Sequence, residues 1–160
     1  MRAIALSQLW PTATLAMAVS TAVLMGCNEA DTTTPTLTPT LLPTHTVSML
    51  IEAGPGNARW FRDVEVPQGY DAYQLTAQVT EGELEATWYP SLRSHFVESI
   101  IGVVNEGAYF WTIFLWDEFD EEWSPLPVGS DWFSVKDGHT LAWSYVDTTQ
   151  QPSPPPSQRP

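Results

Sequence analysis

The stretch Tyr109–Trp116 (YFWTIFLW) is apolar at every position except Thr112. Alternate side chains of a β-strand share a face, so Trp111 and Ile113 point to one side and Phe114 to the other. Both sides are therefore apolar, whereas a half-buried strand alternates apolar with polar residues. The pattern predicts a strand that is covered on two faces.

Alternation also predicts strands over Val47–Ala53 and Ala58–Val66, which the turn signal GPGN joins into a hairpin. A helix is predicted within Gly69–Gly82, where Tyr73, Leu75 and Ala77 form a short apolar stripe that Gly82 ends.

The remaining predicted strands follow this helix and complete the fold class. They span Glu83–Tyr89, His95–Val104, Tyr109–Trp116, Trp132–Val135 and Thr140–Val146. Two strands, one helix and then several strands form an α+β pattern. We predict a β-grasp-like mixed sheet packed on one helix.

The N-terminal residues 1–27 are typical of a secretory signal peptide. Arg2 precedes a proline break and the apolar run ATLAMAVSTAVLMGC, which is too short for a membrane span. The run ends in Leu-Met-Gly-Cys27, which resembles the lipobox of bacterial lipoproteins. The resemblance implies export and lipid anchoring through Cys27 to a membrane of the bacterial cell envelope. The alternative is an ordinary cleaved signal with an incidental cysteine.

Two proline-rich segments flank the central part of the chain. Residues 28–46 repeat Thr-Pro, which neither a helix interior nor a central strand accepts, so we expect an extended tether. Residues 148–160 (TTQQPSPPPSQRP) are predicted to be a disordered or polyproline-like tail. The predicted folded domain is residues 47–147, enough for one modest core.

Charge and cysteine content narrow the function further. The chain has 6 Lys and Arg against 19 Asp and Glu, a formal net charge of −13. This excludes nucleic acid as a partner and electrostatic docking to anionic lipid, since both need clustered cations. The membrane would be reached through the lipid anchor only. A single cysteine excludes an intramolecular disulfide.

The sequence has no motif for catalysis or for a resident metal. The acidic run Asp117–Glu122 lacks the spacing of a calcium loop, and we interpret it as a solvated hairpin tip. The three histidines have no metal-ligand spacing, and no phosphate loop or nucleophile elbow is present. We therefore expect no metal and no enzymatic activity.

An ordered set of short motifs covers roughly the last half of the predicted domain. Its members are Ser99-Ile100, Phe110-Trp111, Pro125-Leu126, Gly129, Phe133 and Lys136-Asp137-Gly138. In this order they resemble the C-terminal β-domain of transcobalamin and intrinsic factor, and bacterial surface domains of unknown function on the same plan. In the vitamin carriers this domain caps one side of cobalamin, and a helical barrel domain cups the other.

The resemblance implies a domain that binds cobalamin or another corrinoid without chemistry, in capture or hand-over, with no covalent cofactor. The positions implied to contact the ligand are Ser91, Leu92, Val97, Trp111, Ile113 and Leu126. The face with Trp111 and Ile113 is thereby assigned to the ligand, and the face with Phe110 and Phe114 to the core. His95 lies beside this surface, and we interpret it as a surface histidine rather than a cobalt ligand.

The chain has no room for the helical barrel of the carriers, so we expect a protein partner to supply that half of the site. A second hypothesis is a surface module that docks a protein or a glycan through the same aromatic face. A third, a purely structural envelope lipoprotein, predicts few exposed tryptophans. Trp88, Trp111 and Trp143 are expected in the core, whereas Trp60, Trp116, Trp123 and Trp132 are candidates for exposure.

Overall fold

The computed structural model describes residues 42–160. The signal peptide of residues 1–27, lipidation at Cys27 and the tether up to residue 41 lie outside the described residues. The elements are β1 (Thr44–Glu52), β2 (Ala58–Pro67), α1 (Ala72–Thr80), β3 (Leu84–Tyr89), β4 (Ser94–Ile100), β5 (Val103–Val104), β6 (Tyr109–Asp117), β7 (Glu122–Pro125), the 3₁₀ turn η1 (Ser130–Trp132) and β8 (Thr140–Asp147). Among these residues no helix is long and apolar enough to cross a membrane.

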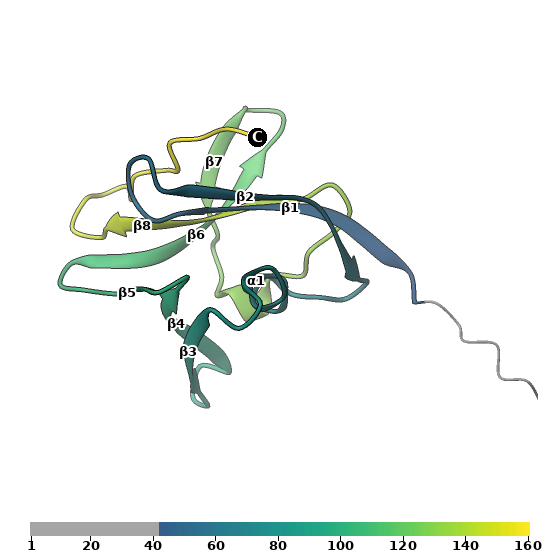
Figure 1. Ribbon diagram of the computed structural model, residues 1–160, viewed down its shortest axis with the longest axis horizontal. Coiled ribbons are helices and arrows are strands. Elements are labelled where there is room, and N and C mark those ends of the chain that lie inside the picture. Colours follow the sequence, from purple (N-terminus) through teal and green to yellow (C-terminus); the bar gives the residue numbers. More distant parts are fainter. Residues whose placement is uncertain (1–41) are drawn as a thin grey trace, which may run out of the picture. The chain divides into compact units, whose positions relative to one another are not determined.

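A five-stranded sheet with strand order β2-β1-β8-β6-β7 forms the larger layer, and α1 lies against one of its faces (Figure 1). The central neighbours β1 and β8 are parallel, and the other pairs of this sheet are antiparallel. The predicted mixed sheet with one helix in an α+β fold is therefore present in the described residues.

A second, three-stranded sheet, β3-β4-β5, was not predicted. The continuous strand predicted over His95–Val104 is divided by a turn, because Ile101 and Gly102 have φ values of 45° and 77°. Glycine adopts such a backbone easily, and Gly102 was the only sequence signal for the break. The turn sends β5 back along β4 and makes a separate small sheet.

Two further boundaries differ from the prediction. β1 begins at Thr44, so the end of the expected tether belongs to the sheet, where Thr46 pairs with Glu65 of β2. The expected strand Trp132–Val135 does not form. Instead, this segment pairs with the start of α1, where Phe133 accepts a hydrogen bond from the Ala72 N–H at 2.9 Å.

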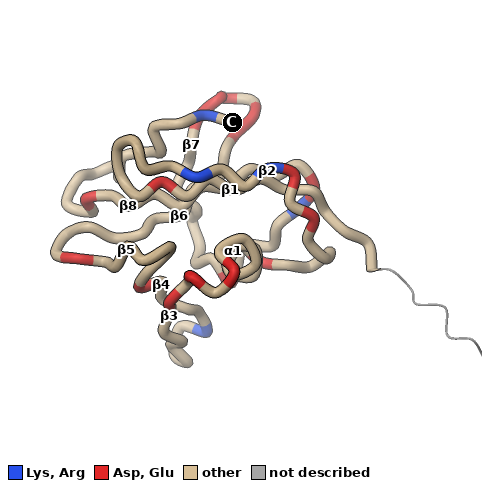
Figure 2. Tube along the Cα trace, viewed as in Figure 1, with Lys and Arg blue, Asp and Glu red and all other residues tan. Residues whose placement is uncertain are grey.

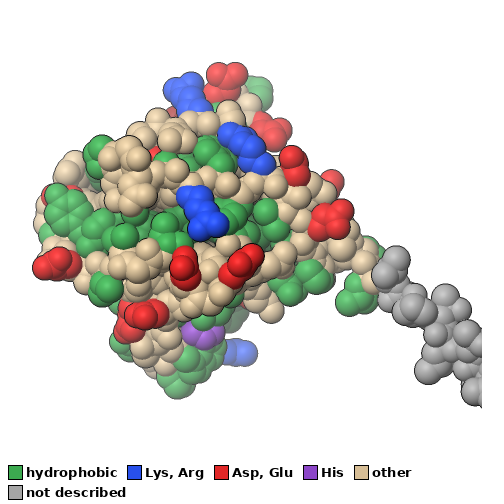
Figure 3. Space-filling model, viewed as in Figure 1, with side chains coloured by type: hydrophobic (Ala, Val, Ile, Leu, Met, Phe, Trp, Pro, Cys, Tyr) green, Lys and Arg blue, Asp and Glu red, His purple; other side chains and the backbone are tan. Residues whose placement is uncertain are grey.

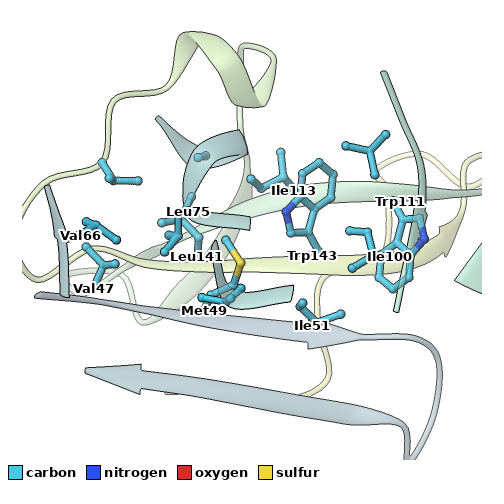
Figure 4. Packing of buried hydrophobic residues seen from close by; sticks show 14 residues of the cluster. Val47, Met49, Ile51, Val66, Leu75, Ile100, Trp111, Ile113, Leu141 and Trp143 are labelled. Atoms are coloured by element: carbon cyan, nitrogen blue, oxygen red, sulfur yellow. The ribbon is translucent and has the colours of Figure 1, made fainter. Parts of the chain in front are cut away.

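The main core lies between the large sheet, α1 and the small sheet. Its buried members are Val47, Met49, Ile51, Val66, Ala72, Leu75, Val79, Val97, Ile100, Trp111, Ile113, Val135, Leu141 and Trp143. Figure 4 shows Leu75 of α1 next to Leu141 of β8, with Trp111 and Ile100 at the other end of the cluster.

The helix is fixed at both ends by local hydrogen bonds and backbone geometry. Asp71 and Gln74 form a capping box, with the Asp71 carboxylate accepting from the Gln74 N–H at 2.7 Å. The buried stripe contains Leu75, as predicted, but runs through Thr76 and Val79 rather than through Ala77. Thr76 satisfies its hydroxyl by donating to the Ala72 carbonyl at 2.7 Å, so a polar residue fits this stripe.

The opposite side of the large sheet has its own apolar cluster, which we call the outer face. It consists of Leu50, Phe114, Trp123 and Ala142, with Ala58, Trp60 and Trp116 packed against them. Residues 148–160, here called the tail, lie over this side and end beside β7 (Figure 1). The tail forms no helix or strand, but its hydrogen bonds to β1, β2 and β7 differ from the expectation of disorder.

Candidate ligand-binding site

A hollow of about 230 Å³ lies between β4, β6 and the segment after β7; we call it the β4–β6 hollow. Val97, Trp111, Ile113 and Leu126 all line it, so four of the six predicted contact residues lie together. Thr112 and Ser130 are the hydroxyl-bearing residues in an otherwise mainly apolar lining, and the Thr112 side chain alternates with those of Trp111 and Ile113 along the strand. These residues come from three separate parts of the chain.

Hydrogen bonds across the edge of β6 shape this hollow. Asn105 bridges the two sheets, because its amide nitrogen donates to the Val97 carbonyl at 2.8 Å and its oxygen accepts from the Trp111 N–H at 3.0 Å. Farther along the same edge, the Leu126 N–H donates to the Ile113 carbonyl at 3.0 Å. The hollow lies between these two attachments, where β4 is beside β6 but does not pair with it.

The predicted division of β6 into a ligand face and a core face needs correction. Trp111 and Ile113 are only 7% and 8% exposed and belong to the helix-side core. Phe114, on the opposite side, is fully buried too, beneath the tail side of the sheet. Both faces of β6 are therefore core, and only those edges of Trp111 and Ile113 that line the hollow can meet a ligand.

The other two predicted contacts lie elsewhere. Ser91 and Leu92 are exposed in the turn between β3 and β4, and neither lines the hollow. Beside this turn is a second hollow of about 350 Å³, lined by Asp71, Trp88, Arg93, Asp131 and Trp132. Ser91 and Leu92 thus lie in the turn that contains Arg93 of this second hollow, and not in the lining of the first.

Large exposed aromatic side chains surround both hollows; we call them the aromatic rim. Its members are Trp88, Tyr89, Phe96 and Trp132. The expectation that Trp88 is a core residue is wrong, because its side chain is 48% exposed. Trp132, a candidate for exposure from the sequence, is 55% exposed. Figure 3 shows apolar side chains gathered at this β3–β4 end. Trp111 and Trp143 are core residues, as predicted.

The strand pattern of Glu83–Tyr89 predicts a core position for Trp88, but the pattern does not give the place of the strand in a sheet. β3 is an edge strand, and its last residues, Trp88 and Tyr89, extend beyond the helix-side core. The adjacent pair of aromatics was a usable signal, since two successive large residues on a strand cannot both face one core.

A cluster of polar groups fixes β4 to η1 between the two hollows. Asp131 accepts hydrogen bonds from the Ser94 hydroxyl and the His95 N–H, both at 2.8 Å, and its second oxygen pairs with His95 Nδ1. The His95 ring stacks on Tyr73 with centroids 4.0 Å apart. Because Nδ1 is engaged, Nε2 is the ring nitrogen that a ligand would meet.

The same contacts shift the pKa values of two carboxyl groups in opposite directions. Burial would raise the pKa of Asp131, but hydrogen bonds from His95 and Ser94 outweigh it and lower that pKa below its ordinary value. Burial, with the nearby Asp131 charge, raises the pKa of Asp71 despite its bonds to the helix N-terminus. The site therefore holds one carboxyl group that is readily ionised and one that is less so.

The acidic run forms the tip of the β6–β7 hairpin, as predicted. Asp117 accepts hydrogen bonds from the backbone N–H groups of Phe119 and Asp120 at 2.8 and 3.1 Å. Figure 2 shows this acidic tip at the β7 end of the molecule, away from β3 and β4. Among residues 42–160 no group of three or more potential ligands is arranged to hold a metal ion.

Comparisons with known proteins show a similarity of fold among solved structures. No protein-family model matches the sequence, and no curated protein does. Among solved structures, haptocorrin in complex with Cbi is similar, with a TM-score of 0.51 at 13% sequence identity. The match covers 66% of this chain and 26% of the haptocorrin chain, so this chain corresponds to about a quarter of that protein. At this identity the match shows a shared fold, consistent with the resemblance to the β-domain of the vitamin carriers.

Proposed function

We propose that this domain is a non-enzymatic binding domain whose ligand is a corrinoid, cobalamin or a relative, acting in capture or hand-over. The observation that carries the proposal is the β4–β6 hollow with the aromatic rim beside it. The fold it shares with haptocorrin, which was solved with the corrinoid Cbi, favours this ligand class over others. The parallel β1–β8 pair beneath one helix supports the finer β-grasp assignment, which we propose with it.

The size of the hollow limits how such a ligand sits. At about 230 Å³ it is smaller than the ~300–1,000 Å³ of sites that enclose a small molecule. It would hold only an edge or a substituent of a macrocycle, and the ring would lie over Phe96 at the rim. Most of the ligand would then remain uncovered, which supports our proposal that a protein partner supplies the other half of the site.

The edge of β6 offers a polar partner for amide substituents. Trp111 donates its N–H to Asn105 and not to β8, so this residue is at a non-hydrogen-bonded position of the β6–β8 ladder. The register continues unshifted to Ile113, whose N–H consequently points to the same side, where the hollow lies. An amide or carboxylate at the edge of the ligand would satisfy this donor.

The second candidate function is the docking of a protein or a glycan through the aromatic rim. The half-exposed rings of Trp88 and Trp132 favour it, because large aromatic rings in water often mark a recognition surface. Flat aromatic surfaces suit sugar rings and protein side chains as well as corrins. Both functions use the same end of the molecule, so binding measurements must separate them.

Titration of the purified protein with cyanocobalamin and with cobinamide tests the ligand. We expect saturable binding, and we expect Phe96→Ser to weaken it by about tenfold or more, which is about 1.4 kcal/mol. Phe119→Ser is the matched control, since Phe119 is also exposed but lies in the hairpin tip. Absence of binding at high micromolar ligand, alone and with neighbouring gene products, would exclude a corrinoid; recovery of a specific partner or glycan from envelope extract through Trp132 would then favour the second function.

We also propose that the protein is exported and anchored in the bacterial cell envelope through a lipid on Cys27. The apolar run and the Leu-Met-Gly-Cys motif support it. Replacement of Cys27 by Ser should release the protein from membranes or stop its processing, as measured by fractionation and by the mass of the mature chain. A Cys27→Ser protein that is correctly cleaved and stays with the membrane would contradict the anchor.

A further inference from the structure

The tail is held against the outer face by a set of specific hydrogen bonds. Gln158 accepts from two tryptophan indoles: its side-chain oxygen from Trp60 Nε1 at 2.8 Å, and its backbone carbonyl from Trp123 Nε1 at 2.7 Å. One residue before it, Ser157 donates its N–H to both Glu52 carboxylate oxygens at 3.1 and 3.0 Å, and its hydroxyl to one of them at 3.0 Å.

The Glu52 carboxylate shows that this contact is more than loose packing. Glu52 ends β1 on the same side as Leu50, and it is only 7% exposed. A buried carboxylate without partners is costly, and the hydrogen-bond donors to Glu52 in the described residues are those of Ser157. The tail thus both covers this charge and satisfies it.

The shape of the outer face suits a proline-rich chain. Small residues flank Glu52, since Ala58 and Ser144 stand opposite it on the two neighbouring strands, and Ala142 lies between Leu50 and Phe114. Trp60 and Trp123 belong to the same face as these small residues. Pro156 is buried immediately before Ser157, which binds Glu52. Proline-rich segments are recognised in this way elsewhere, by aromatic grooves whose polar groups meet free backbone carbonyls.

We propose that the outer face is a binding site for proline-rich peptides, and that the chain's own tail is its resident ligand. Trp60 and Trp123 act as the hydrogen-bond donors of the site, and Glu52 as the acceptor. In the sheet, the contacts to the tail are made by Glu52, Trp60 and Trp123. In the tail, they are made by Ser157 and Gln158. The site is on the face of the sheet opposite α1, so it is independent of the proposed corrinoid site.

Hydrogen exchange of the indole N–H groups, followed by NMR on the full chain, tests whether the tail is docked. Trp88 is the exposed reference, and Trp143, whose Nε1 donates to buried Thr76, is the core reference. We expect Trp60 and Trp123 to exchange at least about tenfold more slowly than Trp88. Exchange of both at the Trp88 rate would overturn the proposal.

Two substitutions in the tail separate specific docking from burial by chance. Ser157→Pro removes both donors to Glu52, and Ser153→Pro is the matched control at a serine without hydrogen bonds in the described structure. Ser157→Pro should speed exchange of Trp60 and Trp123 by about tenfold with Trp143 unchanged, whereas Ser153→Pro should not. Equal exchange in the two variants would count against the site. If Trp143 also loses protection, Gln158→Ala provides a milder comparison: it removes the side-chain acceptor of Trp60 but keeps the backbone carbonyl that accepts from Trp123, so exchange should speed up at Trp60 more than at Trp123.

Binding between molecules is the direct test of the ligand class. A labelled peptide of residues 151–160 should bind the Ser157→Pro chain saturably, and about tenfold more tightly than it binds the unaltered chain, whose own tail competes. The same peptide carrying Ser157→Pro should bind at least about tenfold more weakly. If neither peptide binds, or if both bind alike, the outer face does not recognise a proline-rich segment.

Discussion

Both faces of the large sheet contain fully buried side chains, but the two faces are covered by different means. Met49 and Leu50 are neighbours on β1, point to opposite faces, and are both 0% exposed. Helix α1 and the small sheet cover Met49, whereas the tail, which has no regular structure, lies on the side of Leu50. Surface burial alone does not distinguish these two residues.

The hydrogen bonds of the two covers show where they differ. On the helix side, Trp143 Nε1 donates to Thr76 at 2.7 Å in a fully buried setting. On the tail side, the bond from Trp60 to Gln158 is exposed, and the one from Trp123 is only partly buried. Breaking the first requires the core to open, while the second can open locally. We infer that opening the helix side requires the full free energy of unfolding, whereas opening the outer face requires only a smaller, local free energy.

The largest test of this difference is the matched pair Met49→Ala and Leu50→Ala. Substitutions of this kind cost about 2–5 kcal/mol, and the cost grows with the cavity that cannot close. We expect Met49→Ala near the upper end of that range and Leu50→Ala near the lower end, since the tail can settle into the space. Chemical denaturation measures both, and equal losses would show that the tail is as rigid a cover as the helix.

The buried bond between Trp143 and Thr76 should have the next largest effect. Thr76→Val keeps the shape but leaves the Trp143 indole N–H without an acceptor, which costs about 1–3 kcal/mol. Trp143→Phe combined with Thr76→Val should cost less than the sum of the single changes. Additive losses in this double-mutant cycle would mean that the bond contributes nothing to the cover.

The helix cap should contribute less. Asp71→Ala removes the carboxylate that accepts from the Gln74 N–H, for an expected loss of about 1 kcal/mol in the free energy of unfolding. Asp71→Asn keeps a capping side chain and should cost clearly less. If both variants unfold like the unaltered protein, α1 is held by its buried stripe alone.

The smallest effect is a pH dependence at the junction of β4 with η1. Because the pKa of Asp131 is lowered in the folded protein, its stabilisation is present above the unfolded value of about 3.9 and is lost as pH falls through the folded pKa. The advantage over Asp131→Asn should therefore shrink in acid. Asp71 has a raised pKa and therefore the opposite pH dependence. Its contribution to the free energy of unfolding is present below a pH of about 3.9 and is lost as pH rises through the folded pKa.

Denaturation of Asp131→Asn and Asp71→Asn at pH values below and above about 3.9 measures both effects. The difference in free energy of unfolding from the unaltered protein should change with pH in opposite directions for the two variants. If the stability advantage over Asp131→Asn does not shrink in acid, the hydrogen bonds from His95 and Ser94 do not hold the Asp131 carboxylate in solution.

The sequence predicts β6 well because its signal is local. Two apolar faces on Tyr109–Trp116 predict a doubly covered strand, and the structure confirms one. What covers the second face could not be predicted, because the tail has hardly any hydrophobic pattern. Its contacts depend on Gln158 and Ser157, polar residues that meet strands about a hundred positions away.

The candidate site was predicted less completely, for a related reason. Val97, Trp111 and Leu126 do lie together, but this was predicted from the family resemblance alone, because no periodicity in the sequence connects the three residues. The exposure of Trp88 was missed because it follows from the edge position of β3, which is a tertiary property. The division of the predicted strand His95–Val104 depended on one glycine, too weak a signal against its apolar pattern.

The parallel pairing of β1 with β8 has a consequence for how the chain acquires its structure. Ser48 pairs with Thr140, roughly 90 residues later, so the centre of the sheet cannot form until nearly the whole domain is available. Until then β1 has only its hairpin partner β2, and its other edge is open to the wrong strand. We therefore expect slow folding that ends with the insertion of β8, during which an aromatic-rich intermediate would need protection from self-association.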